Sequence, residues 1–497
     1  MALPGTTISI LDGGLGITTP ATSRAHVIGV FESGTANVPT LVGNQRQLKE
    51  LFGTNGPGND TVGRILDIAG GPVVVTRVTA TVVATYGQAS MPSSIAPGAN
   101  NAIGTLVATS APKNDYAIVV NIISTVSGVL AGTIFQYSLD GGKTFSPNIA
   151  AAATVALGTS GVTLEFGTGV TNVYAAGATY TGTSKAPHYD ASNLTTVFNA
   201  ADASVLAWDF FVFAGEAATA AAAATLFATI SARLASYATP AKDRYFRAIM
   251  GAGEGTPASV VTAFSALIDV RIAVLQGKGR APVSFNAVGR SIPHLPTLVF
   301  AAERAAGNVM STDLAQTSGA ASVGALIGVT EPGQNEFLSP AGLDDIRIGT
   351  LRTWPNGLPG IFLTNVWLKG SPGTDFEYWQ HGRMMDEACK VVSGVAAGLN
   401  SSNVICKADG TGQLLEFSAR QLDARFQRPL DNVIGSGVRG IGPATVDGST
   451  GHLSDVKAQV DRTNNVLSTK TLIVTVSLVP RAYFKNVTVT LSYRLAA

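Results

Sequence analysis

The chain has 497 residues, of which 13% are charged, and its 33 lysines and arginines nearly balance its 32 aspartates and glutamates. Because there is no basic excess to neutralise phosphates, direct binding of nucleic acid is not expected. The charged fraction lies below the quarter or so that is usual for soluble proteins, which suggests that part of the surface is hidden in an assembly.

Residues 1–20 are predicted to form an N-terminal arm. In the stretch TTISILD, Ile8 and Ile10 alternate with polar neighbours, as they do in a half-buried strand, and the glycines of DGGLG then break the strand. The start of the chain lacks the basic and apolar regions of a signal peptide, so we expect none.

The next segment, residues 21–85, has an α/β pattern. AHVIGVF indicates a buried strand, NQRQLKELFG a helix closed by Gly53, and GPVVVTRV a second buried strand. Between them, DTVGRILDIAG indicates a helix with Asp60 as its N-cap and Gly70 as its C-cap. This order favours a sheet covered by helices.

Residues 86–190 are predicted to be an inserted all-β domain, because short β-type runs there alternate with Gly, Ser and Pro. The clearest signal is FQYSLDGGKTF, in which Asp140-Gly141-Gly142 indicates the turn of a hairpin.

The α/β pattern returns over residues 191–480. WDFFVFAG and DRYFRAIMG indicate strands, and TPASVVTAFSALID indicates a helix. The alanine-rich run 217–230 is too short to span a bilayer, so we expect a packed helix and no membrane insertion. Cys389 and Cys406 alone cannot form a disulfide framework or a zinc site, and we expect a reduced, cytosol-made protein. The predicted fold class is therefore α/β or α+β, with a mixed sheet flanked by helices.

The last residues, 481–497, are predicted to form a C-terminal arm. Two strand-like runs meet at Pro480. In the first run every second residue is apolar and is expected on one face: Leu472, Val474, Val476 and Leu478. The RAYFK stretch that follows Pro480 is not a two-residue hairpin turn, so the sequence does not favour folding of the second run back on the first. One face of the second run would carry Val487, Val489, Leu491 and Tyr493.

A glycine-rich loop at MGAGEGTPASV is the first candidate for chemistry. Glycines between a strand and a helix can cradle a phosphate. However, the spacing of Gly251, Gly253 and Gly255 departs from the dinucleotide-binding pattern, since the third glycine comes one residue early. The alternative is an ordinary turn with Thr256 as N-cap and Pro257 at the first helical position.

The second candidate is DFEYWQHGRMMDEACK at 375–390. On a helix, Glu377 and His381 would lie one turn apart with Asp386 and Glu387 further on, and metal ligation is conceivable. The alternative is an amphipathic helix on which His381 pairs with Glu377 on the solvent side. Its inward residues would be Phe376, Trp379, Met385, Ala388 and Val392. Neither candidate completes a catalytic motif, and we expect neither enzymatic activity nor a cofactor.

Several of these stretches resemble the tail sheath proteins of contractile-tailed bacteriophages. LPGTTISI is similar to the start of sheath N-terminal arms, and VIGVFESGTANVPTLVGNQRQLKELFG followed by GRILDIAGGPVVVTRV is similar to the family's first α/β segment. The block from LRTWPNGLPG to MMDEACKVV and the closing strands LIVTVSLVPRAYFKNVTVTLSYRL also resemble the family. The resemblance covers roughly residues 1–85 and 195–497.

The resemblance implies a subunit that stacks in hexameric rings around a tail tube and contracts to drive the tube through the host envelope. It implies that both arms add strands to neighbouring subunits, through Ile8 and Ile10 and through the face from Val487 to Tyr493. Hinges are then expected at Gly13, Gly14, Gly16 and Pro480. The implied partners are further copies of this chain, the tube, the baseplate and the tail terminator, in a virion assembled in the host cytoplasm.

Three alternatives stay open at this point. The first is the sheath of a phage-derived contractile injection system or bacteriocin. A type VI secretion sheath is expected less, because it is usually split between two polypeptides. The second is an α/β nucleotide-binding enzyme that uses the loop at 251–256. The third is a surface adhesin whose β domain binds glycans.

Overall fold

The computed structural model describes residues 23–79, 89–90, 93–94, 106–109, 111–168, 173–215, 217–239, 242–280, 286–287, 290–291, 294–308, 310, 312–317, 326, 328–330, 342–354, 358–399, 402–435 and 456–478.

A seven-stranded sheet lies at the centre of the molecule, in the order β2-β3-β1-β13-β14-β15-β21. Only β2 runs antiparallel to its neighbour, so the sheet is mixed, as predicted. Its strands are continuous apolar runs, which suits a sheet buried on both faces. They are β1 (Ala25–Gly29), β2 (Thr40–Val42), β3 (Val73–Arg77), β13 (Phe210–Ala214), β14 (Arg247–Gly251), β15 (Ile272–Leu275) and β21 (Ile348–Gly349).

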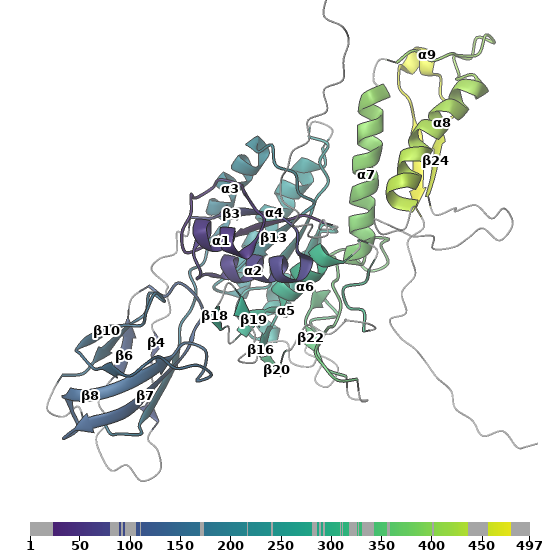
Figure 1. Cartoon of the computed structure of the whole chain (residues 1–497). Helices are drawn as coiled ribbons and strands as arrows, with labels where there is room; N and C mark the ends of the chain where they lie inside the picture. The colour runs from purple at the N-terminus through teal and green to yellow at the C-terminus, as the bar shows by residue number, and fades with distance from the viewer. Residues whose placement is uncertain are drawn as a thin grey trace, which may run out of the picture.

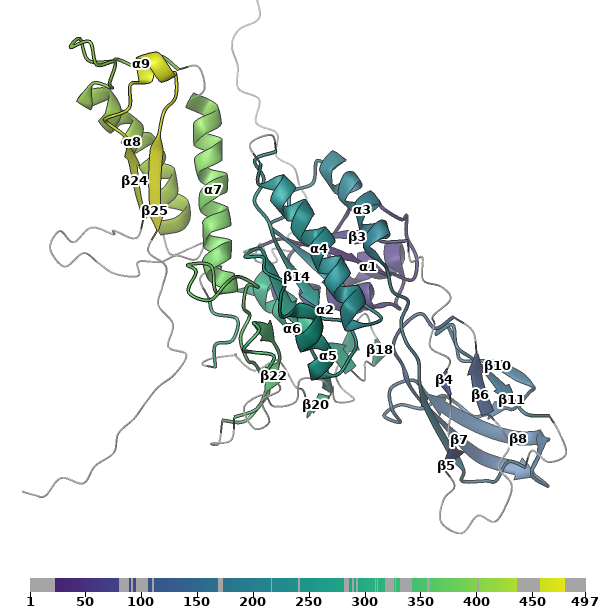
Figure 2. The same ribbon diagram turned by 180° about the vertical axis from the view of Figure 1, so that it is seen from behind.

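Helices cover both faces of this sheet (Figures 1 and 2). Alternate strand residues face opposite sides, so Val27 and Val212 belong to one core while Ile28 and Phe211 belong to the other. The first core is covered by α1 (Gln45–Phe52), α2 (Pro57–Ala69) and α6 (Thr297–Gly307), and the second by α3 (Ala191–Ala203), α4 (Ala220–Tyr237) and α5 (Pro257–Phe264).

The ends of these helices confirm most of the predicted caps. Gly53 follows α1, and Gly70 follows α2 in the left-handed conformation. The prediction that Asp60 is the N-cap of α2 was wrong, because the helix begins at Pro57 after Gly56. Proline has the backbone angle of a first helical residue, so it starts the helix one turn earlier and leaves Asp60 inside the first turn.

Between β3 and α3, every element that the structure describes is a strand. The strands form a four-stranded sheet (β10-β11-β6-β4) and a five-stranded sheet (β5-β12-β7-β8-β9), which share a core that includes Phe135, Tyr174 and Tyr180. The bounds are β4 (Ala89–Ser90), β5 (Ser93–Ser94), β6 (Leu106–Thr109), β7 (Ala117–Val126), β8 (Val129–Ser138), β9 (Ile149–Ala150), β10 (Thr154–Ala156), β11 (Thr163–Phe166) and β12 (Thr179–Thr183).

A hairpin does form around Asp140, since β8 and β9 pair antiparallel on either side of it, but its loop is too long for a two-residue turn. A two-residue turn is formed by Ser127 and Gly128, both with positive φ, and it joins β7 to β8. Asp140 instead holds a longer loop, since one carboxylate oxygen accepts hydrogen bonds from the backbone N–H groups of Lys143 and Thr144 at 2.9 Å each. The strand after this loop is β9, which pairs with β8.

The C-terminal part forms a separate group of elements on the opposite side of the sheet from the strands of 89–183 (Figure 1). We call the part from α8 onward the C-terminal module, and α7 (Trp379–Leu399) joins it to the sheet. The module contains α8 (Glu416–Leu430), a π-helical turn (Asp431–Gly435), β24 (Val456–Val460), α9 (Val466–Thr469) and β25 (Val474–Leu478).

Shorter strands complete the described structure below the sheet. They are β16 (Lys278–Arg280), β17 (Asn286–Ala287), β18 (Arg290–Ser291), β19 (His294–Pro296), β20 (Gly328–Thr330), β22 (Leu351–Arg352) and β23 (Phe362–Leu363). Across the residues that the structure describes, no helix combines the length and apolar character needed to cross a bilayer.

Candidate assembly surfaces

Helix α7 is fixed to the amino ends of the parallel strands by buried charges. Arg247, at the start of β14, forms an ion pair with Asp386 at 3.1 Å, and both side chains are less than a tenth exposed. Arg383 donates to the carbonyl oxygen of Asp209, just before β13, and Lys390 donates to the Asp209 carboxylate at 2.8 Å. Burial acts to raise the pKa of Asp209, but Arg383 and Lys390 outweigh it and lower that pKa. These contacts fix the position of α7 relative to the main sheet.

Close packing of α7 against Arg247 requires a glycine. A Cβ on Gly382 would lie 2.2 Å from the Arg247 Nε atom. Glycine is unfavourable inside a helix, so its use here reflects the approach of the buried guanidinium.

The C-terminal module has a small apolar core between α7, α8 and the two strands. Met384 and Ala388 of α7 pack with Phe426 and Leu430 of α8 and with the inner face of β24. On β25 and just before it, the residues that contact this core are the alternating set predicted from the sequence: Leu472, Val474, Val476 and Leu478. The face predicted for this strand is therefore confirmed.

Side chains close the outer edge of β24. Gln427 accepts a hydrogen bond from the Ala458 N–H and donates one to the Val456 carbonyl, each at 2.8 Å. Asp423 accepts from the Val460 N–H at 2.7 Å, and Arg462 donates to the Val460 carbonyl at 2.7 Å. Backbone groups of a strand alternate between its two edges, so these bonds occupy the groups that point away from β25.

The outer edge of β25 is different. Within the described residues the sheet has two strands, and β25 pairs only with β24. An edge strand presents N–H and C=O groups that can pair with an added strand. Among the described residues, the module therefore has one edge closed by side chains and, along β25, one edge that no other strand covers.

The strands of 89–183 are attached on the opposite side of the main sheet, at the carboxyl ends of its parallel strands. We call this side the carboxyl edge, and the side that α7 contacts the amino edge. Asn114 donates to the Asp60 carboxylate at 2.7 Å, and Tyr116 donates its hydroxyl to Asn55 at 2.9 Å. Lys113 contacts Glu32 at 2.7 Å. Partial burial acts to raise the pKa of Glu32, but Lys113 and the donors of residues 54 and 55 lower it to about 2.

The glycine-rich loop lies in this same region, between β14 and α5. Thr256 is the N-cap and Pro257 the first helical residue, as the alternative interpretation predicted. Gly253 has φ near +79°, and a Cβ there would lie 2.5 Å from the Thr219 carbonyl oxygen, so this glycine permits close backbone packing. The Glu254 carboxylate forms ion pairs with Lys185 and Lys278.

Little space remains for a nucleotide at this edge. Ligands of open α/β sheets bind beyond the carboxyl ends of the strands, where the strand order reverses, and here that point lies between β1 and β13. The cavity beside it has a volume of about 30 Å³ and is lined by Asp60, Asp115 and Glu254 among others. That volume holds about one water molecule, which is far too small for a nucleotide.

The helix predicted over 375–390 begins later than expected. It starts at Trp379, so Glu377 precedes the helix and forms an ion pair with Arg347 at 2.6 Å. The backbone N–H of Gly373 lowers the pKa of the Glu377 carboxyl, and His381 also helps to lower it. His381 packs edge-on against the Tyr378 ring. Asp386 faces Arg247, and Met384 is the more deeply buried of the two methionines, not Met385. Within the described ranges, no group of His, Cys, Asp and Glu is arranged to hold a metal ion.

The residues predicted for the arms and hinges lie outside the described residues. They are Ile8, Ile10, Gly13, Gly14, Gly16, Pro480, Val487, Val489, Leu491 and Tyr493. Strand β24 and the residues that close its edge were not predicted from the sequence. The alternation of Val456, Ala458 and Val460 was a usable signal for the strand, but nothing in the sequence points to Gln427 or Asp423.

No family model matches this sequence, and no curated protein matches it. Over nearly its whole length the chain is similar in structure to sheath tail proteins. One is the sheath tail protein Lin1278 from Listeria innocua, with 11% identity, a TM-score of 0.49 and coverage of 93% of this chain and 92% of that chain. Another is the sheath tail protein DSY3957 from Desulfitobacterium hafniense, with 12% identity, a TM-score of 0.44 and coverage of 96% and 100%. The helical sheath of the anti-feeding prophage in its contracted state has 12% identity, a TM-score of 0.48 and coverage of 99% of both chains.

Proposed function

We propose that this chain is the structural subunit of a contractile tail sheath, which polymerises as stacked hexameric rings around a tail tube. Contraction of this polymer would drive the tube through the host envelope for genome delivery. The observation that carries the proposal is the open edge of β25, followed in the sequence by a second alternating run over residues 486–495. The uncovered edge of β25 in one subunit could pair with the second run of another subunit, and repetition of this pairing would build a polymer.

The C-terminal arm is proposed to supply the added strand to another subunit. Val487, Val489, Leu491 and Tyr493 would form its apolar face, and the strand around Ile8 and Ile10 of a further subunit would complete the sheet. A ten-residue strand spans about 33 Å, which is enough to reach a neighbour. About five ladder hydrogen bonds at roughly 1 kcal/mol net each would hold it.

Flexible connections would let the subunits move while these strands stay paired. Gly13, Gly14, Gly16 and Pro480 are the proposed hinges. Contraction would then be a rigid-body rearrangement between two lattices, with the energy stored at assembly and no nucleotide or cofactor required. The proposed partners are other copies of this chain, the tube, the baseplate and the terminator, in a virion tail assembled in the host cytoplasm.

Removal of residues 486–497 tests the strand exchange. We expect the truncated chain to fold with an unchanged melting temperature and to lose polymerisation, measured by sedimentation and negative-stain microscopy. Val489→Pro should act in the same way because it removes a ladder donor, whereas Val489→Thr should polymerise. Normal polymers from the truncated chain, or its failure to fold, would contradict the exchange. A full-length chain that stays monomeric at high concentration would contradict the sheath function itself.

A further inference from the structure

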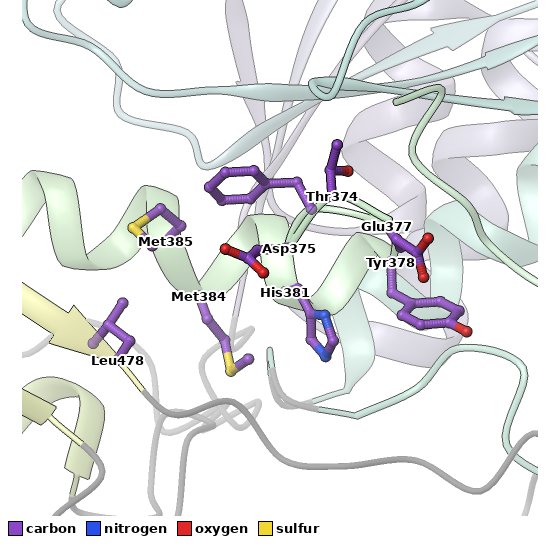
Figure 3. Close-up of a pocket in the computed structure, with 9 residues that line it drawn as sticks. Thr374, Asp375, Glu377, Tyr378, His381, Met384, Met385 and Leu478 are labelled. Atoms are coloured by element: carbon purple, nitrogen blue, oxygen red, sulfur yellow. The ribbon is translucent and has the colours of Figure 1, made fainter. Parts of the chain in front are cut away.

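A cavity of about 350 Å³ lies where α7 begins and β25 ends. Figure 3 shows Met384 and His381 projecting from α7 on one side, with Leu478 across from Met384 at the end of β25. Phe376, Tyr378 and Met385 complete the apolar lining. An apolar cavity of about 150 Å³ holds one benzene ring, so this one has room for aromatic side chains.

Two polar groups in the cavity lining have no partner among the described residues. Asp375 is exposed and engages no cation there, whereas its neighbour Glu377 binds Arg347 at 2.6 Å. The Thr374 hydroxyl oxygen is shielded from solvent and accepts no hydrogen bond in the described part of the chain. The cavity therefore offers apolar walls, one free carboxylate and one hydroxyl in need of a partner.

The sequence that follows the cavity matches these features. Leu478 lines the cavity, and the next residues are Val-Pro-Arg-Ala-Tyr-Phe-Lys, with two aromatic side chains between two basic ones. Six residues span at most about 20 Å, so Tyr483 and Phe484 can turn back into a cavity that begins at Leu478. Aromatic rings pack favourably against methionine sulfur, and Arg481 or Lys485 can pair with Asp375.

We propose that residues 481–485 dock into this cavity in the same chain, with the Tyr483–Phe484 pair among the methionines and a basic neighbour at Asp375. The docked segment fixes the point at which the C-terminal arm leaves its own subunit. With the segment docked, the pivot of the arm lies after Lys485, which moves the C-terminal hinge proposed above from Pro480 to this point. This consequence rests on the proposed sheath function, but the docking itself does not require a polymer.

Photo-cross-linking tests the docking in the full-length chain, whether monomeric or polymeric. The photoreactive residue p-benzoylphenylalanine, which reacts readily with methionine C–H bonds, replaces Phe484 in one variant and Tyr483 in another. An equal mixture of isotopically heavy and light chains is irradiated and digested, and the cross-linked peptides are identified by mass spectrometry. Because both positions are substituted separately, steric rejection of the probe at one of them does not remove the test.

We expect cross-links from 483 or 484 to Met384 or Met385 within one chain, carrying a single isotope label. The same probe at the exposed Phe417 of α8 is the control and should not reach these methionines. Asp375→Lys should lower the cross-link yield by about two- to fivefold, as expected for loss of an exposed ion pair, and leave the Phe417 control unchanged. Mixed-isotope cross-links would overturn the proposal in favour of a second copy, and links to other sites or to none would overturn the docking. Neither result bears on whether the protein polymerises, which sedimentation measures separately.

Discussion

Helix α7 is attached at the amino edge of the main sheet, and the strands of 89–183 are attached at its carboxyl edge. The two attachments differ in how deeply their charges are buried. At the amino edge, Arg247 and Asp386 are 5% and 7% exposed. At the carboxyl edge, two lysines that form ion pairs near the strands of 89–183 are more exposed: Lys113 is 39% exposed and Lys185 is 40% exposed. The Arg247–Asp386 pair is therefore shielded from solvent, whereas solvent screens the pairs made by Lys113 and Lys185.

This difference determines which part can be removed. A charge left unpaired in the interior is costly, whereas an exposed ion pair contributes little. We therefore interpret α7 as part of the rigid framework that carries the C-terminal module. The strands of 89–183 have their own apolar core and are tied to the sheet by contacts that are individually weak.

The largest effect is expected from breaking the buried pair. Asp386→Ala leaves the Arg247 guanidinium buried without its carboxylate, and should lower the free energy of unfolding by about 3–5 kcal/mol. Glu416→Ala is the control, because Glu416 also binds an arginine but is 52% exposed, and its loss should leave the free energy of unfolding nearly unchanged. Denaturant unfolding of both variants measures the difference. Equal losses would contradict the distinction between buried and exposed ion pairs on which this comparison rests.

A smaller effect is expected when the strands at the carboxyl edge are removed. Replacing residues 86–188 by a short Gly-Ser linker should leave the remainder folded, with a loss of about 1–3 kcal/mol from the broken polar contacts. The cut is placed before Tyr189, which belongs to the core of the main sheet, and before Asp190, which caps α3. Circular dichroism and thermal melting measure the outcome. An unfolded remainder would mean that these strands are not a separable insertion.

The elements of the main sheet could be predicted because their signals are local. A run such as Phe210–Ala214 indicates a buried strand by itself, and Thr256-Pro257 indicates a helix start. The wrong N-cap at Asp60 had a local cause too, because Gly56-Pro57 is an alternative helix start one turn before Asp60. The tight turn between β7 and β8 was missed because Ser127-Gly128 is a less obvious turn sequence than the Asp-Gly-Gly of the next hairpin.

The contacts that define the candidate surfaces could not be predicted. Asp423 and Gln427 close the edge of a strand more than thirty residues later in the chain, at Val460 and Ala458. Such pairings depend on the tertiary arrangement, and no spacing in one sequence reveals them. The arms, in contrast, were predicted from alternation and resemblance, and they stay predictions because they lie outside the described residues.

A pH effect should sharpen the comparison at the carboxyl edge. The pKa of Glu32 is lowered from 4.5 to about 2, so its contribution to stability is present above pH 4.5 and is lost as the pH falls through about 2. Glu32→Gln should remove this dependence, with a loss of about 1 kcal/mol at neutral pH after solvent screening. Thermal melting of both proteins between pH 5 and 3 measures it. Parallel melting curves across this range would show that Glu32 does not titrate as its contacts imply.

The smallest effect is the response of the two edges to salt. A double-mutant cycle with Lys185→Met and Glu254→Gln should give a coupling below about 1 kcal/mol at low ionic strength. In 1 M salt the screening length falls to about 3 Å, and this coupling should vanish because Lys185 is 40% exposed. The same cycle on Arg247 and Asp386 should keep its value, since solvent ions do not reach a pair that is less than a tenth exposed. A buried pair that weakens with salt as much as the exposed pair would show that the amino edge opens in solution, and α7 would then be a movable connection to the C-terminal module.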